Sequence, residues 1–167
     1  MQTQQTTPQH PDQRTSTENT AVVRRFVEEC QVGGNMDTFH ALIHPDFVDH
    51  TRPPGISPGP QGVLEQFGAF RQVLTGFDVR IVVQVTEGDL VATHKIFSGM
   101  HEGDFLGIPA SGQRVELAVS DILRIRDGRI AEHWGVLNLA PLLFAASSAA
   151  TAATTATATA ATSAAGA

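Results

Sequence analysis

The stretch from residue 115 to residue 136, VELAVSDILRIRDGRIAEHWGV, constrains the fold more than any other part of the chain. It reads as two strands joined by a tight turn, and alternate side chains of a strand face the same side. One face of the first strand carries Val115, Leu117, Val119, Leu123 and Ile125. The single polar residue on that face is Asp121. The pattern predicts an antiparallel hairpin that carries one carboxylate into apolar surroundings.

The Asp127-Gly128 dipeptide predicts a two-residue type I′ turn, because both central positions of that turn need a positive φ. Counting back from this turn pairs Asp121 with Trp134, the chain's one tryptophan. A longer loop would shift the register by one residue and place His133 there instead.

An aspartate in an apolar pocket beside an indole resists ionisation. Its pKa is then expected to rise from ~3.9 toward the range of a general base. The alternative interpretation is a structural aspartate bonded to Ser120 or to backbone amides. The spacing alone does not separate the two roles of Asp121.

Length and composition limit the classes of function. A chain of 167 residues with 41% hydrophobic content suits one domain with a sizeable core. A net charge of −6, with scattered basic residues, argues against nucleic acid or an anionic membrane as partner and leaves small molecules as the expected ligands. The single cysteine, Cys30, excludes an internal disulfide and a cysteine-based zinc site. With no apolar core of a signal peptide and no stretch that spans a bilayer, the expected location is cytoplasmic.

The composition divides the chain into three parts. Residues 1–16 are rich in Gln, Thr and Pro and are predicted to be disordered. Residues 17–144 form the predicted domain. Residues 145–167 contain only Ala, Ser, Thr and Gly, which predicts a loose low-complexity tail or a frayed helix.

Three helices are expected before the strands begin. The first starts near Thr17, and the second covers about 36–43, where His40 and His44 lie four residues apart. That spacing suits a metal, but no third ligand is identifiable, so no metal is expected. The third helix starts at Pro60 and carries Phe67 and Phe70 on its apolar stripe, which core packing alone would explain.

Two further histidines are candidates for the pocket. A turn at Gly88-Asp89 pairs Val83 with His94 and places His94 on the apolar face of the sheet, where the alternative is a buried histidine with one satisfied hydrogen bond. The glycine-rich loop that follows brings His101 to the end of its strand. Strand parity puts His101 off the pocket face unless a bulge intervenes.

Three stretches carry a family resemblance: GNMDTFHALIHPDFVDHTRPPG, FSGMHEGDFLGIPASGQRVEL and DILRIRDGRIAEHWGVLNL. They resemble the SnoaL-like polyketide cyclases, also called the ester cyclase family, over roughly residues 20–144. The resemblance implies the cone-shaped α+β fold of the nuclear-transport-factor-2-like superfamily, with three N-terminal helices packed on a curved antiparallel sheet.

The resemblance also implies a cofactor-free and metal-free enzyme that closes a ring of a polyketide or related small hydrophobic substrate by intramolecular aldol chemistry. The family's acid/base aspartate maps onto Asp121. His101 matches a histidine of the family's GTH-type motif and would help to hold the enolate oxygen. The chain departs from the family at His94-Lys95, where relatives often carry an arginine followed by an aromatic residue, and at Asn138, where an acidic residue is common.

The remaining expected site residues supply hydrogen-bond donors and apolar walls for a substrate. They are His50, His94, Trp134, Phe67 and Phe70. Two alternatives stay open: a non-catalytic ligand-binding or dimerisation domain of the same fold, and a hydrolase or isomerase that uses the same aspartate.

Assembly is predicted from the outer face of the sheet. That face is expected to carry Val82, Ala118, Ile122 and Ala131 among its polar residues. A partly apolar open face favours a homodimer.

Overall fold

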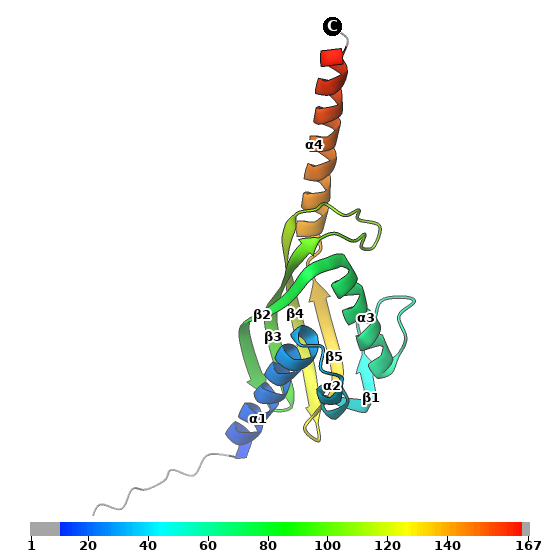
Figure 1. Ribbon diagram of the computed structural model, residues 1–167. Helices are drawn as coiled ribbons and strands as arrows, with labels where there is room; N and C mark the ends of the chain where they lie inside the picture. Colours follow the sequence, from blue (N-terminus) through cyan, green and yellow to red (C-terminus); the bar gives the residue numbers. More distant parts are fainter. Residues whose placement is uncertain (1–10, 165–167) are drawn as a thin grey trace, which may run out of the picture.

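The computed structural model describes residues 11–164. Its helical elements are α1 (Pro11–Arg25), the π-helix η1 (Phe26–Val32), α2 (Met36–Leu42), α3 (Gly59–Val73) and α4 (Ala140–Ala164). Its strands are β1 (Ile43–Asp49), β2 (Leu74–Glu87), β3 (Leu90–His101), β4 (Arg114–Arg126) and β5 (Arg129–Leu137). Helices α1 to α3 pack against one face of the curved sheet, and α4 projects away from the body (Figure 1). The predicted α+β fold class is confirmed.

The five strands form one sheet in the order β1-β5-β4-β3-β2. Neighbours from β2 to β5 pair antiparallel, but β1 pairs with β5 in parallel, so the sheet is mixed. The second predicted helix ends at Leu42, one residue before the predicted end, and the chain continues as edge strand β1. Pro45 is tolerated there because an edge strand can leave a backbone position unpaired, and the β1–β5 register shifts across this segment.

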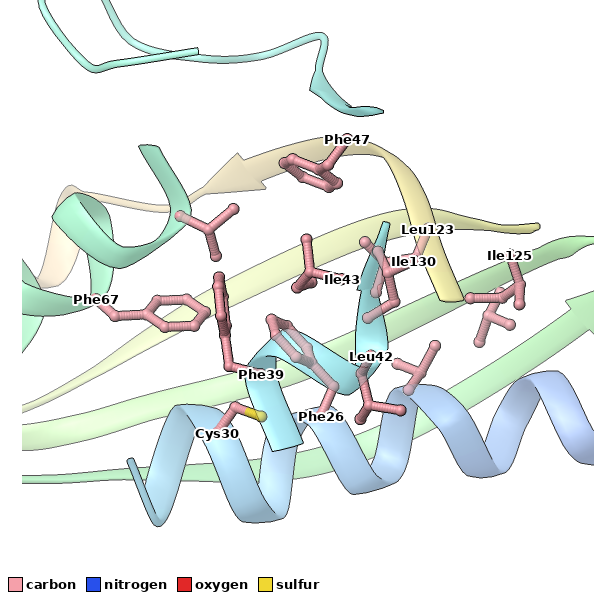
Figure 2. Packing of buried hydrophobic residues seen from close by; sticks show 13 residues of the cluster. Phe26, Cys30, Phe39, Leu42, Ile43, Phe47, Phe67, Leu123, Ile125 and Ile130 are labelled. Atoms are coloured by element: carbon pink, nitrogen blue, oxygen red, sulfur yellow. The ribbon is translucent and has the colours of Figure 1, made fainter. Parts of the chain in front are cut away.

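One core cluster lies between the helices and the sheet. The rings of Phe26 of η1 and Phe67 of α3 have centroids 5.7 Å apart. Figure 2 shows both rings in the cluster, together with Phe39. Phe39 and Leu42 of α2 and Ile130 of β5 belong to the same cluster. Each such side chain contributes about 1.5–3 kcal/mol through burial, which fixes the helices against the sheet.

A second cluster anchors the start of α4. Leu142 is fully buried and Ala145 nearly so, whereas Leu143 and Phe144 are 52% and 73% exposed. Residues three or four apart share a helix face, so Leu142 and Ala145 face the core, and Ala146 packs beside them. The segment 145–167, predicted to be a loose tail or a frayed helix, is helical as far as Ala164.

The first helix begins earlier than the sequence predicts. Helix α1 starts at Pro11, within the segment 1–16 predicted to be disordered, and residues 1–10 lie outside the described part of the chain. Proline suits a first helical turn because its φ is preset and its missing N–H would lack a partner there. Among residues 11–164, no helix has the length and apolarity needed to cross a membrane.

Candidate active site

The β4–β5 hairpin starts as predicted and then departs from prediction. Asp127 and Gly128 form the turn with φ of 52° and 70°, and Ile125 pairs with Ile130. The register then shifts, because Arg124 pairs with Glu132 and leaves Ala131 as an extra residue in β5. The predicted pairing of Asp121 with Trp134 is therefore wrong.

This bulge decides which residues enter the interior. Asp121 lies opposite Gly135, and His133 lies opposite Leu123 on the inner face. Trp134 turns outward and stacks on His50, with ring centroids 4.4 Å apart and planes at 6°.

The two stacked residues contact other outer groups. The His50 Nε2 lies 2.8 Å from Glu132, and the Arg124 guanidinium lies 5.8 Å from the Trp134 ring centroid. His50 and Trp134, both expected to bind substrate, do not line the inner cavity.

The inner cavity has a volume of about 410 Å³ and lies between the helices and the inner face of the sheet. Its walls are mostly apolar, and Phe67 and Phe70 line it as predicted. The polar or charged lining residues are Gln31, Asp49, Thr51, Gln66, Lys95, Asp121 and His133. A cavity of this size and lining suits a small hydrophobic molecule that carries a few polar groups.

Four charged side chains run along this cavity, and we call them the buried charge chain. The Lys95 Nζ forms an ion pair with Oδ2 of Asp121. Oδ1 of Asp121 lies 3.3 Å from Nε2 of His133, and Nδ1 of His133 lies 2.9 Å from Oδ1 of Asp49. The side chains of Lys95, Asp121 and Asp49 are 3%, 7% and 5% exposed.

The charges set the protonation states in this chain. Burial alone would raise the pKa of Asp121, but the Lys95 cation and His133 outweigh burial and lower the pKa to about 2. The predicted rise in the pKa of Asp121 is therefore wrong. Burial alone would lower the pKa of His133, but its bonds to Asp121 and Asp49 raise the pKa to about 9. At neutral pH the buried charge chain holds two cations and two anions.

Asp49 is held in its ionised form by several donors. Burial disfavours the carboxylate, but the hydrogen bond from His133 and further donors bring the pKa of Asp49 well below its usual range. Thr51 donates to Oδ1 through its backbone N–H at 2.9 Å and its hydroxyl at 3.0 Å. Gln66 donates to Oδ2 at 3.2 Å.

Gly135 makes room for the contact between Asp121 and His133. A Cβ at this position would lie 2.6 Å from Nε2 of His133 and 3.0 Å from Oδ1 of Asp121. Any other residue would displace one of the two side chains. The Gly135 N–H donates to the Thr51 hydroxyl at 3.0 Å, which joins this part of β5 to the residues around Asp49.

The π-helix η1 supplies the second partner of Lys95. Gln31 is 4% exposed, and its Oε1 accepts a hydrogen bond of 3.1 Å from the Lys95 Nζ. Arg71 of α3 donates to the carbonyls of Cys30 and Gln31 at 3.0 and 2.8 Å. π-helical turns leave carbonyls in irregular positions, and here α3 supplies the donor for them.

His94 lies on the opposite face from the one predicted. It pairs with Val83 as expected, but this face is the outer one, where Val83 is 53% exposed. The His94 Nδ1 lies 2.9 Å from the Ser120 hydroxyl. The error came from assigning the exposed apolar residues of β2 to the core, and the neighbouring residue Lys95 faces the cavity instead.

His101 is fully buried at the end of β3, with Nδ1 3.1 Å from the Ser111 hydroxyl. Its Nε2 has no hydrogen-bond partner within the described residues, and it is not among the residues that line the inner cavity. His44 belongs to β1 rather than to the helix of His40. Within residues 11–164 no group of three or more His, Cys, Asp or Glu side chains has an arrangement suited to a metal ion.

The sequence reasoning missed Lys95, His133, Asp49 and Gln31 as cavity residues. Lys95 carried a usable signal, because it is the one lysine of the chain and stands in an apolar strand with Phe97 on the same face. His133 appeared only as the neighbour of Asp121 in the alternative register, because the β5 bulge decides which face it takes.

The comparisons with known proteins agree with this fold. Nogalonic acid methyl ester cyclase from Streptomyces nogalater is 28% identical over 102 residues, which are 60% of this chain and 76% of that protein. IdmH from Streptomyces antibioticus is 29% identical with a TM-score of 0.66, and the match covers 76% of this chain and 96% of IdmH. TsrD from Streptomyces laurentii is 25% identical with a TM-score of 0.69, over 78% of this chain and 95% of TsrD. The profile of the SnoaL-like polyketide cyclase family matches residues 21–145, so the chain belongs to that family.

Proposed function

We propose that this protein closes a ring of a small hydrophobic polyketide-type ester by acid–base chemistry that needs no cofactor, with Asp121 as the base. The observation that carries the proposal is the Asp121 carboxylate, 7% exposed in a largely apolar cavity, with Nε2 of His133 3.3 Å from its Oδ1. The similarity to a cyclase that acts on a methyl ester supports the same substrate class. It also favours an enzyme over a non-catalytic binding domain.

The charges suggest how the steps divide between side chains. Asp121 takes a proton from the carbon next to a carbonyl, and the C–H electron pair moves into an enolate. The enolate carbon then forms the new C–C bond with a second carbonyl of the same molecule, whose oxygen receives a proton from His133. The proton on Asp121 returns to His133 across their 3.3 Å contact, which restores the site.

A low pKa makes Asp121 a weak base, so the cavity must supply the rest of the driving force. Holding both reacting carbons in one dry cavity gives proximity. Fixed cations near the developing oxyanion stabilise it without reorganisation. The predicted raised pKa of Asp121 is not needed for this mechanism.

The test measures ring closure of nogalonic acid methyl ester and of related aromatic polyketide methyl esters by wild type and by Asp121→Asn. We expect the substitution to lower kcat by about 10²- to 10⁴-fold, the range for loss of a positioned acid–base group. The matched control is Arg80→Met, which changes an exposed cation of β2 outside the cavity and should retain activity. Binding without turnover by wild type would favour the non-catalytic alternative, and hydrolysis without ring closure would favour a hydrolase.

We also propose that the protein forms a homodimer through the outer face of the sheet. Apolar residues of that face that are at least 43% exposed include Val82, Val83, Val85, Ile122 and Val136. Val83, Val85, Ile122 and Val136 line a shallow hollow formed by β2 to β5. The expected contribution of Ala131 to this face is wrong, because the bulge buries that residue to 1% exposure.

A further inference from the structure

Lys95 stands out because it is the only lysine in the chain and is almost fully buried. It lines the inner cavity and contacts Asp121 and Gln31. A buried cation beside a proposed base is costly unless it is matched in charge. The mechanism above gives Asp121 and His133 their proton transfers but does not say which oxygen the Lys95 cation faces.

The donors of Lys95 exceed the acceptors around it. An ammonium group carries three hydrogens. Among the described residues, its hydrogen-bonding or ion-pair partners are Oδ2 of Asp121 and Oε1 of Gln31. The ring centroid of Phe97 lies 5.3 Å from Nζ, which adds a cation–π contact but no acceptor of comparable strength. One hydrogen remains for a group in the cavity.

We propose that Lys95 is the counter-ion of the substrate enolate. This role rests on the proposed function, because it begins when Asp121 accepts a proton. The C–H bond breaks, an O–H bond forms on Asp121, and the negative charge moves from the carboxylate to the enolate oxygen. Lys95 stays in place and exchanges one anionic partner for another.

This exchange explains how a weakly basic aspartate can drive the reaction. In the resting site, Lys95 stabilises the Asp121 carboxylate and so weakens it as a base. After proton transfer, the same ammonium stabilises the enolate. The electrostatic attraction between Lys95 and the negative charge is therefore kept during the reaction. His133 remains free to protonate the second oxygen.

The substrate class follows from this geometry. The acidic carbon must lie between or beside carbonyls, and one carbonyl oxygen must reach the Lys95 ammonium while the carbon faces Asp121. A 1,3-dicarbonyl compound with an apolar body meets both conditions. A substrate with no enolisable carbonyl would gain nothing from Lys95.

The first experiment uses benzoylacetone, an aromatic 1,3-diketone whose enol and enolate differ in near-ultraviolet absorbance. Wild-type protein should increase the acidity of the bound enol by at least about tenfold, or one pKa unit. Asp121→Asn should increase that acidity further, because the competing carboxylate is gone. Lys95→Met should abolish the increase, and Arg80→Met should leave it unchanged.

A second measurement uses the wild-type protein and needs no variant. Because the chain has one lysine, ¹⁵N-lysine labelling gives a single side-chain amine signal. We expect this signal to shift as benzoylacetone saturates the site and to show a protonated amine before and after binding.

If Lys95→Met fails to fold, the double variant Lys95→Met/Asp121→Asn replaces it in the enol-acidity measurement, because it removes both charges together.

The outcomes separate the two proposals. The role of Lys95 would be overturned if Lys95→Met increased the acidity of the bound enol as much as wild type does. An amine signal that does not respond to ligand would also overturn it. A borohydride-trapped adduct between Lys95 and benzoylacetone would also overturn it, because the lysine would then act as a nucleophile. Full ring closure by Asp121→Asn would instead overturn the proposed base while leaving the enolate measurement intact.

Discussion

The two faces of the β3–β4–β5 sheet differ sharply in how they hold charge. On the inner face, Lys95, Asp121 and His133 form part of the buried charge chain, and each group contacts an opposite charge. On the outer face, His50 is 39% exposed and stacks on Trp134, and water reaches the surrounding charges. Neighbouring residues of the same strands supply both faces.

The difference shows where a charge matters. In the interior, removing one partner leaves an ion that neither water nor protein solvates. At the surface, water replaces the lost partner at little cost. The inner face therefore depends on complete pairing, whereas the outer face tolerates change and is free for contact with another molecule.

The largest expected effect comes from breaking the inner pair. We expect Lys95→Met to lower the free energy of unfolding by about 3–5 kcal/mol, because the buried charge chain is left with two anions and one cation. The matched surface change is Asp89→Asn, which removes the partner of Arg124 at 2.7 Å where both side chains are over a third exposed. It should cost at most about 1 kcal/mol. Urea unfolding curves give both values.

A double variant sharpens this result. Lys95→Met/Asp121→Asn leaves no unpaired charge at that position and should recover a large part of the loss. If Lys95→Met cost no more than Asp89→Asn, the two faces would not differ as described.

The second effect concerns pH. The pKa of His133 is raised from 6.5 to about 9, so the stability that it contributes is complete below about 6.5 and is lost as the pH rises through 9. The pKa of Asp121 is lowered from 3.8 to about 2, so its contribution is complete above about 4 and is lost as the pH falls through 2. Stability from these groups should be highest between about pH 4 and 6.5.

The alkaline part of this dependence is specific to one residue. We expect the free energy of unfolding to fall by up to about 3 kcal/mol between pH 6.5 and 9.5, following the shift of His133. Chemical denaturation at several pH values measures it. His133→Gln should flatten the slope in this range, and an equally steep slope in that variant would assign the dependence to another group.

The sequence was most informative where local rules decide the structure. The Asp127-Gly128 turn, the aromatic stripe of the third helix and the position of Asp121 on an apolar strand face follow from φ preferences and periodicity. These rules need only neighbouring residues. The fold class followed from the order of the elements and from the family resemblance.

The features that the sequence did not predict depended on strand irregularities that periodicity does not reveal. One extra residue in β5 exchanges His133 and Trp134 between the two faces, and a register shift in β2 separates the exposed Val83 from Ile81. The pKa of Asp121 was predicted in the wrong direction because burial was considered without Lys95, which comes from the neighbouring strand. Contacts between side chains of neighbouring strands can be predicted only when the register of the strands is known.

The third effect tests the close approach at Gly135. We expect Gly135→Ala to displace the His133 ring, lower the free energy of unfolding by about 1–3 kcal/mol and remove most of any acid–base activity. The control is Gly68→Ala in α3, where an added Cβ meets nothing within 4 Å. Alanine is the better helix former, so this change should stabilise the protein by about 0.5–1 kcal/mol.

Histidine NMR spectra would show whether His133 keeps its two hydrogen bonds in Gly135→Ala. Unchanged His133 signals together with wild-type stability would mean that the β5 backbone moves instead of the ring. The close contact of Gly135 with His133 and Asp121 would then have no role in function.

The smallest expected effect on stability, and the largest on assembly, comes from the outer face. Val85 is 65% exposed in the outer hollow, so Val85→Glu should change the free energy of unfolding by less than about 0.5 kcal/mol. In a homodimer, the same change buries two charges at the interface and should convert the protein to a monomer. Light scattering at micromolar concentration measures the mass.

Phe144→Glu on α4, where the native residue is 73% exposed, is the matched control and should leave the dimer intact. A wild-type protein that is monomeric under these conditions would mean that the apolar outer face serves another contact, because exposure of this kind is unusual without a partner.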